Sequence, residues 1–236
     1  MKRLLTACLF LSHLAINAQS VINSRIKYSI DIGSDSLNHL RQNARTSTDT
    51  LNYFLAKINN IDIDPIDGVI SAIDSLVDVN NRLKIIDTRS YELFREGCVL
   101  WKRNERKTGI EKMKEAMDLF DRQKTILSVC GLFSGMRFLF SYAGLQEERL
   151  KYFSDKLKYY QKNGPVEMTG QCYHAIAGYY AAKEDYNNAI SNFLQSAEVI
   201  RTLSPLGYCN EMCVTGTYYY LWGNNERAKY LLAKGL

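Results

Sequence analysis

A 39-residue spacing between two segments near the carboxyl end constrains the fold of this 236-residue chain more than any other feature. The matched pairs are Tyr173 and Met212, Ile176 and Thr215, Ala177 and Gly216, Tyr180 and Tyr219, Ala189 and Ala228, and Phe193 and Leu232. A fixed period of this length is typical of helical hairpins that stack and bury their apolar faces against one another. The sequence therefore predicts an all-α chain, a solenoid of antiparallel helix pairs.

Apolar stripes and turn residues divide residues 125–236 into three hairpins. We expect paired helices over 125–143 and 146–161, over 166–183 and 186–203, and over 208–222 and 226–236. Gly144 and Gly223 mark tight turns inside hairpins, whereas Pro165 and Pro205, 40 residues apart, lie between them. Short loops of this kind join antiparallel neighbours.

Residues 19–87 carry helix signals without a convincing repeat. Residues 26–32 alternate like a short strand or an extended lead-in. Helix starts are expected at Ser34-Asp35-Ser36, within residues 46–50, and at Asp64-Pro65, with Asp64 as the cap and Pro65 at the first helical position. Asp87-Thr88 caps a further helix, and residues after it begin to follow the repeat.

The first 18 residues have the three parts of a secretory signal peptide. Lys2 and Arg3 form a positive start, residues 4–16 are apolar, and Ala18 supplies a small residue at the exit. The alternative is an ordinary buried first helix. Cys8 would carry a lipid if the residues before it formed a lipoprotein box, although the apolar run continues beyond it. We expect an exported protein, periplasmic or envelope-associated, which contacts a membrane only through such an anchor.

The repeated residues resemble the tetratricopeptide repeat (TPR), in which a bulky residue, a small residue and a tyrosine precede alanine, an aromatic residue and proline. Those positions hold Tyr173, Ile176-Ala177 and Tyr180, followed by Ala189, Phe193 and Pro205. The match is good over 166–236. It is looser over 124–165, where Arg149 replaces the small residue and Phe153 keeps the aromatic one, and looser again over 88–122. The resemblance implies a right-handed α-solenoid, a TPR-like superhelix.

The signal-like start and the resemblance together predict a signal peptide (1–18), a divergent N-terminal helical region (19–87) and a TPR-like helical repeat domain (88–236). The resemblance also implies a binding site, because the concave face of this family is lined mainly by first helices. The residues of this chain that fall on that face are Ser134, Phe138, Tyr142, His174, Asn210, Thr217 and Tyr220.

A subgroup of the family uses Lys and Asn on this face to clamp a partner's C-terminal carboxylates. The corresponding positions hold Ser134, His174 and Cys213, then Phe138, Gly178 and Thr217, so that clamp is missing. Binding on this face would rest on aromatic area and neutral hydrogen bonds. We expect most of Tyr179, Tyr180, Tyr218 and Tyr219 to pack between helices instead.

No residue pattern predicts catalysis, a cofactor or a metal site. His39 and His174 stand outside any metal-ligand spacing, and the acidic series at Asp62, Asp64 and Asp67 lacks the later glutamate of a calcium loop. The chain has 30 Lys and Arg residues against 25 Asp and Glu, and its densest lysine series, over residues 151–162, is interleaved with other residues as on a solvated helix face. We therefore expect neither an enzyme nor a nucleic-acid-binding protein.

Five cysteines follow the predicted signal: Cys98, Cys130, Cys172, Cys209 and Cys213. Their odd number and their places near helix starts favour packing over a disulfide framework. Residues 125–145 are mostly apolar and contain Gly131-x-x-x-Gly135, a spacing found in membrane helix pairs. Arg137 lies at the centre of this stretch, which favours contacts between stacked hairpins over a membrane span.

The function that follows is a non-catalytic, protein- or peptide-binding scaffold of the cell envelope. The alternative is the sensory N-terminal input region of a TPR-containing membrane sensor kinase or transcription regulator, the chain being a fragment or short relative. The last helix carries Leu231, Leu232 and Leu236 without a polar cap, which solenoid ends need for solubility. We expect a partner, further chain or self-association to cover this C-terminal hairpin.

Overall fold

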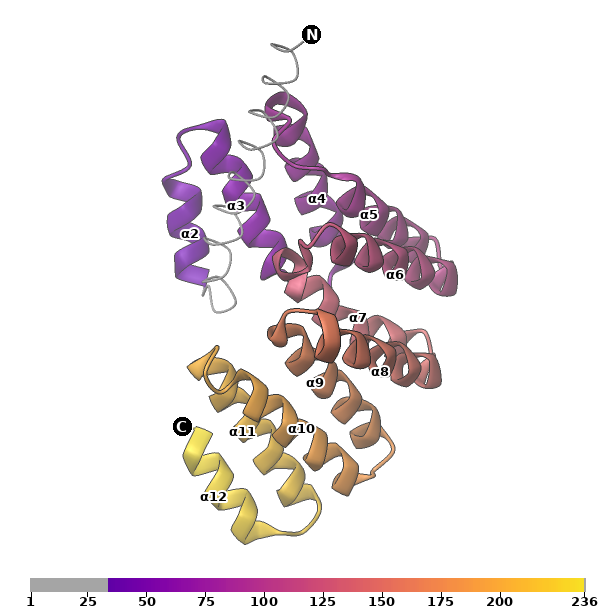
Figure 1. The fold of residues 1–236 in the computed structure, drawn as a ribbon, viewed down its shortest axis with the longest axis vertical. Helices are drawn as coiled ribbons and strands as arrows, with labels where there is room; N and C mark the ends of the chain where they lie inside the picture. Colours follow the sequence, from indigo (N-terminus) through magenta and orange to yellow (C-terminus); the bar gives the residue numbers. More distant parts are fainter. Residues whose placement is uncertain (1–33, 236) are drawn as a thin grey trace. The chain divides into compact units, whose positions relative to one another are not determined.

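The structure is a computed structural model that describes residues 34–235. Over this range the chain forms eleven α-helices, α2 to α12, and one 3₁₀ helix, and it contains no strand (Figure 1). The all-α prediction is therefore confirmed for the described range. The predicted signal peptide and the strand-like alternation at residues 26–32 lie outside it.

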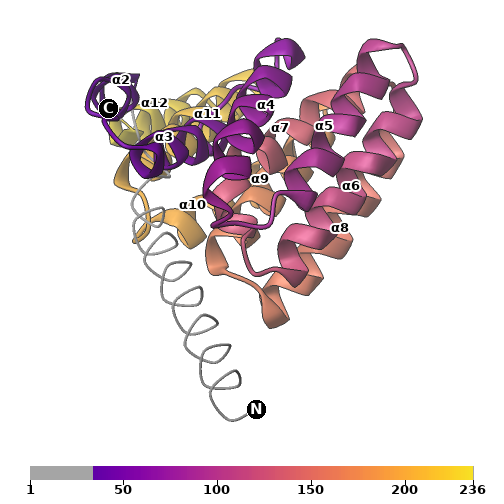
Figure 2. The ribbon, with the colours of Figure 1, turned by 90° about the horizontal axis from the view of Figure 1, so that it is seen from above.

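Two compact units divide the chain, the first ending at Phe133 and the second beginning at Ser134. The first contains α2 (Ser34–Gln42), α3 (Ser47–Asn59), α4 (Ile66–Leu83), α5 (Arg89–Lys102), α6 (Arg106–Arg122) and the 3₁₀ helix η1 (Ile126–Val129). From α3 to α6 each helix packs on the next, and Figure 2 shows α5 and α6 side by side. The core of this unit includes Leu51, Ile58, Ile73, Phe94 and Phe120, all with no exposed area.

The boundary between the units lies within α7 (Cys130–Tyr142), inside the segment that the sequence assigns to the repeat domain. The second unit continues with α8 (Gln146–Asn163), α9 (Val166–Ala182), α10 (Tyr186–Ile200), α11 (Pro205–Leu221) and α12 (Asn225–Gly235). From α8 onward each helix packs on the next, and α9 to α12 lie side by side in chain order (Figure 1). Gly144 and Gly223 adopt positive φ angles of 71° and 86° at the predicted turns, a conformation that glycine adopts without strain.

The small residues of the 39-residue pattern lie where the helices of the second unit approach most closely. Ala177 and Ala189 have no exposed area and form one cluster with Phe193. A Cβ atom added to Gly216 would lie 2.9 Å from Leu232 Cγ and 3.2 Å from the Ala228 carbonyl oxygen. The repeat is thus a packing pattern, because each small position admits a side chain or the backbone of the partner helix.

Two prolines have different roles from those predicted. Pro65 is the N-cap of α4, with extended backbone angles (φ −80°, ψ 138°), so the helix begins one residue later than expected. Pro205 instead opens α11, three residues before the predicted start at 208. The reason is the Ser204 hydroxyl, which accepts a hydrogen bond from the Gly207 amide at 2.8 Å and caps the helix directly before the proline.

Thr46, within the range 46–50 where the sequence predicts a helix start, caps α3 through a reciprocal capping box. Its hydroxyl accepts from the Asp49 amide at 3.1 Å, and the Asp49 carboxylate accepts from the Thr46 amide at 3.0 Å. We expect Thr46→Ala to lower the free energy of unfolding of the first unit by about 1 kcal/mol, since it leaves a helix-terminal amide without its partner. Urea denaturation measures the change, and Thr46→Ser, which keeps the hydroxyl, should retain most of the stability.

Cysteines and the apolar segment behave as packing elements. Cys98, Cys130 and Cys172 are buried, and Cys209 and Cys213 are partly buried. A Cβ atom on Gly131 would lie 2.5 Å from the Asn59 carbonyl oxygen, so this glycine is a contact point between α7 and α3. Among residues 34–235 no helix is long and apolar enough to cross a membrane.

Candidate functional site

The predicted face begins on α7, where Ser134, Phe138 and Tyr142 follow one another at four-residue steps. Residues at this spacing lie on one side of a helix. Ser134 is half-buried, whereas 40% of Phe138 and 53% of Tyr142 is exposed. The helix therefore presents two aromatic side chains to solvent along one stripe.

The other predicted residues lie on α9 and α11. Asn210, Thr217 and Tyr220 are exposed along α11, with 64% of Tyr220 accessible. On α9 the His174 side chain is 23% exposed. We call the seven residues Ser134, Phe138, Tyr142, His174, Asn210, Thr217 and Tyr220 the predicted face. All seven belong to the second unit and none is fully buried.

His174 joins two hairpins through a partner that the sequence does not reveal. Its Nδ1 lies 2.6 Å from Oε1 of Glu211 on α11. The Ser196 hydroxyl on α10 lies 3.1 Å from the same oxygen and 3.0 Å from the Gly170 carbonyl. Glu211 is 7% exposed, and its Oε2 has no hydrogen-bond partner within the described chain. This network holds α9, α10 and α11 together, since breaking a buried polar pair leaves its groups unsatisfied.

The contacts of Arg149 are the second feature that the sequence does not reveal. Arg149 stands in the first part of α8, at the position that holds alanine in the later hairpins, and is 5% exposed. Its Nη1 donates to the Ser141 hydroxyl at 3.0 Å and its Nη2 to the Ala175 carbonyl at 2.7 Å. A Cβ atom on Gly178 would lie 2.5 Å from Nη2. The missing side chain at Gly178 therefore makes room for the guanidinium.

The charge of Arg149 is not balanced by an acid. Within the described residues no carboxylate bonds to its guanidinium, and Nε, which is fully buried, has no hydrogen-bond partner. Burial lowers the pKa of Arg149 to about 10, with a further lowering by Arg137, while Tyr218 acts in the opposite direction. The group stays cationic at neutral pH in an environment that disfavours the charge.

The prediction that most of Tyr179, Tyr180, Tyr218 and Tyr219 pack between helices agrees with their contacts. Tyr218 stacks on Phe193 with ring centroids 5.1 Å apart and an interplanar angle of 15°. Tyr180 and Tyr219 pack against the two apolar clusters of this unit. Tyr179 is 8% exposed and donates its hydroxyl to Glu147 at 2.8 Å. The exposed aromatic area of the predicted face thus comes from other residues, chiefly Phe138, Tyr142 and Tyr220.

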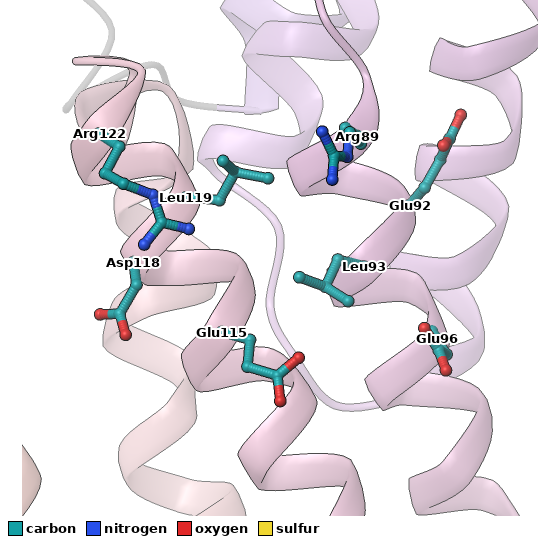
Figure 3. Close-up of a pocket in the computed structure, with 8 residues that line it drawn as sticks. All are labelled: Arg89, Glu92, Leu93, Glu96, Glu115, Asp118, Leu119 and Arg122. Carbon is teal, nitrogen blue, oxygen red and sulfur yellow. The ribbon is translucent and has the colours of Figure 1, made fainter.

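A separate cleft of about 530 Å³ lies between α5 and α6 in the first unit (Figure 3). It is lined by Arg89, Glu92, Leu93 and Glu96 from α5 and by Glu115, Asp118, Leu119 and Arg122 from α6. Figure 3 shows the two arginines at one end of the cleft and Glu96 with Glu115 further along. Lys112 pairs with Glu115 at 3.0 Å. Charges of both signs therefore border an open polar groove.

Metal-ligating residues do not converge within the described range. No group of three or more His, Cys, Asp or Glu side chains there is arranged to hold a metal ion. In the calcium-like series, the Asp67 carboxylate pairs with Lys102. The predicted face thus offers exposed aromatic rings and neutral hydrogen-bonding groups, together with the His174 imidazole bonded to Glu211.

No family model matches the chain, and no curated protein matches its sequence. Among solved structures, BtubC (BKLC) from P. vanneervenii is similar in fold, with a TM-score of 0.51. The two chains are 13% identical, and the likeness covers 83% of this chain and 89% of that one. At this level of identity the similarity concerns the helical fold alone.

Proposed function

We propose that this protein is a non-catalytic scaffold of the cell envelope that binds a protein or peptide segment on the predicted face. In this proposal the helix pairs form a right-handed, TPR-like solenoid, and first helices α7, α9 and α11 supply the binding surface. The observation that carries it is the exposure of three large aromatic residues, Phe138, Tyr142 and Tyr220, at positions that the resemblance assigns to the concave face.

Exposed aromatic residues support binding for an energetic reason. Complete burial of an aromatic side chain removes roughly 150–250 Å² from water, of which an interface here gains the part that is still exposed, and tyrosine adds a polar tip at low conformational cost. Residues of this kind dominate the binding energy of protein interfaces. Ser134, Asn210 and Thr217 add neutral hydrogen-bonding groups on the same helices. Export to the envelope is supported by the signal-like first 18 residues.

To test the proposal, peptides that bind the full-length protein are selected from a display library. Their affinity is then measured by fluorescence anisotropy. We expect Tyr142→Ala and Tyr220→Ala each to weaken binding by about 10-fold or more, which corresponds to about 1.4 kcal/mol per ring. Tyr159→Ala is the matched control, because this α8 tyrosine is 40% exposed and lies outside the predicted face. Equal loss in all three variants, or no loss in any, would contradict the proposal.

A second candidate, the sensory input region of a larger regulator, is favoured by the hairpin α11–α12. Leu221, Trp222 and Tyr230 on this hairpin are 55%, 50% and 58% exposed, and a further helix could pack on them. Sequencing the gene beyond residue 236 tests this reading, which predicts a membrane helix followed by a kinase or regulator domain. Sedimentation velocity tests self-association through the same hairpin. If a dimer forms in this way, Trp222→Ala should lower the dimer fraction.

A further inference from the structure

We propose that Arg149 is an anion-binding residue, which receives a side-chain carboxylate from an acidic partner segment at the point where α9 carries Gly178. The proposal rests on the proposed function and adds the chemistry of the partner to it. It assigns a charged contact to a face that the sequence describes as aromatic and neutral.

In this proposal the partner carboxylate reaches the guanidinium beside Gly178. Gly178 is partly exposed, and it occupies the position on α9 that corresponds to Phe138 on α7 and Thr217 on α11. Apart from its own helix, the only atoms within 4 Å of a Cβ built there are Arg149 Nη2, at 2.5 Å, and Cζ, at 3.7 Å. The guanidinium therefore lies against α9 at a position whose counterparts on α7 and α11 carry exposed side chains.

The guanidinium has hydrogen-bonding capacity left over. Five N–H groups are available on an arginine, and the described contacts of Arg149 are the two bonds to Ser141 and to the Ala175 carbonyl. Nε has no partner but is fully buried, so the groups left for a ligand are the second N–H of Nη1 and the second N–H of Nη2. Both acceptors are neutral, so the positive charge has no counter-charge in contact, a state that costs free energy in a protein interior.

Charge complementarity identifies the occupant as acidic. None of the seven residues of the predicted face is Asp or Glu, and the carboxylate bonded to His174, that of Glu211, is buried. Arg137 adds positive charge near Arg149, and its guanidinium lies 4.5 Å from the centre of the Phe138 ring. The Tyr218 phenol on α11 lies close enough to Arg149 to influence its charge. A carboxylate fits this environment, because arginine binds it through two parallel N–H bonds.

The experiment compares two labelled peptides on the full-length chain at constant ionic strength. One has alternating Glu and Phe residues, and the other has Gln in place of Glu; both are acetylated and amidated, so that side chains carry the only carboxylates. We expect the Glu peptide to bind the unmodified protein about 10-fold more tightly than the Gln peptide. Arg149→Met should abolish this preference, whereas Lys158→Met, which removes an exposed charge on the same helix, should retain it.

A second variant guards against unfolding of Arg149→Met. Gly178→Ala keeps the arginine but places a Cβ atom 2.5 Å from Nη2, so the guanidinium must move and the preference should fall several-fold. Circular dichroism checks that each variant retains its helices. Acetate should displace the Glu peptide at least as well as inorganic phosphate does; stronger displacement by phosphate would overturn the carboxylate assignment.

The remaining outcomes are distinct. Equal binding of both peptides would overturn the anion site and leave the proposed scaffold function standing. If folded Arg149→Met still bound the Glu peptide more tightly than the Gln peptide, the carboxylate would bind elsewhere, which would also overturn the anion site. Absence of binding by either peptide would refute the acidic partner, and the display-selected peptides would then decide the scaffold function separately.

Discussion

Gly97→Ala is expected to destabilise the first unit by about 2–3 kcal/mol, because α5 and α6 touch through their backbones at this residue. A Cβ atom on Gly97 would lie 2.7 Å from the Gly109 carbonyl oxygen and 2.7 Å from Met113 Cγ. A Cβ atom added to Gly109 would likewise lie 2.7 Å from the Gly97 carbonyl oxygen. Real Cβ atoms essentially never come so close to other heavy atoms, so the two helices would have to separate and loosen the core around Phe94.

Gly68→Ala is the matched control and should have the opposite sign. This glycine lies in the first turn of α4, and the nearest atom to its added Cβ is Ile61 Cδ1 at 3.9 Å. Alanine there relieves the entropic penalty of a helical glycine, worth up to about 1 kcal/mol. Trp101 on α5 and Trp222 after α11 lie in different units. In a Trp222→Phe background, tryptophan fluorescence during denaturation therefore reports on the first unit alone. If Gly68→Ala lowered the free energy of unfolding as much as Gly97→Ala does, the close-packing argument would be refuted.

Phe153→Ala should lower the free energy of unfolding of the second unit by about 3–5 kcal/mol. Phe153 on α8 has no exposed area, and its ring centroid lies 6.2 Å from that of Phe140 and 5.2 Å from that of Tyr152. Alanine would leave a cavity among rings that cannot close it without moving α7 and α8. Thermal and urea denaturation followed by Trp222 in a Trp101→Phe background measures the loss.

Tyr159→Ala tests whether this loss comes from burial. Tyr159 lies on the same helix but is 40% exposed, so its truncation should cost well under 1 kcal/mol, roughly, as surface changes do. Comparable losses for both residues would mean that α8 does not bury the face on which Phe153 lies. The same variant serves as the control for binding, and its stability must therefore be known.

Local sequence signals predicted much of the helical framework because helix ends and apolar stripes are short-range features. The Thr46 cap and the turns at Gly144 and Gly223 formed as expected. The predicted start of α11 at residue 208 was wrong, because Ser204 caps the helix and Pro205 is its first residue. The segment predicted as a continuous helix from residue 125 begins with the 3₁₀ turn Ile126–Val129.

The exposed aromatic residues of the candidate site could be chosen from spacing, because residues four apart share a helix face. Phe138 and Tyr142 are exposed in this way on α7. The contacts behind that face could not be chosen. His174 bonds to Glu211, 37 residues away, and Arg149 bonds to Ala175, 26 residues away. The sequence around each of these residues does not indicate its partner.

The sequence by itself determined that the chain is helical, where most helices begin, and which small residues let neighbouring helices approach. These properties depend on residues within a few turns of one another and on a period of 39 residues. Tertiary structure decided what lies behind Gly178. An arginine occupies a position that is alanine in later hairpins because a glycine on the next helix makes room for it. Such compensation depends on packing between helices, which no local pattern encodes.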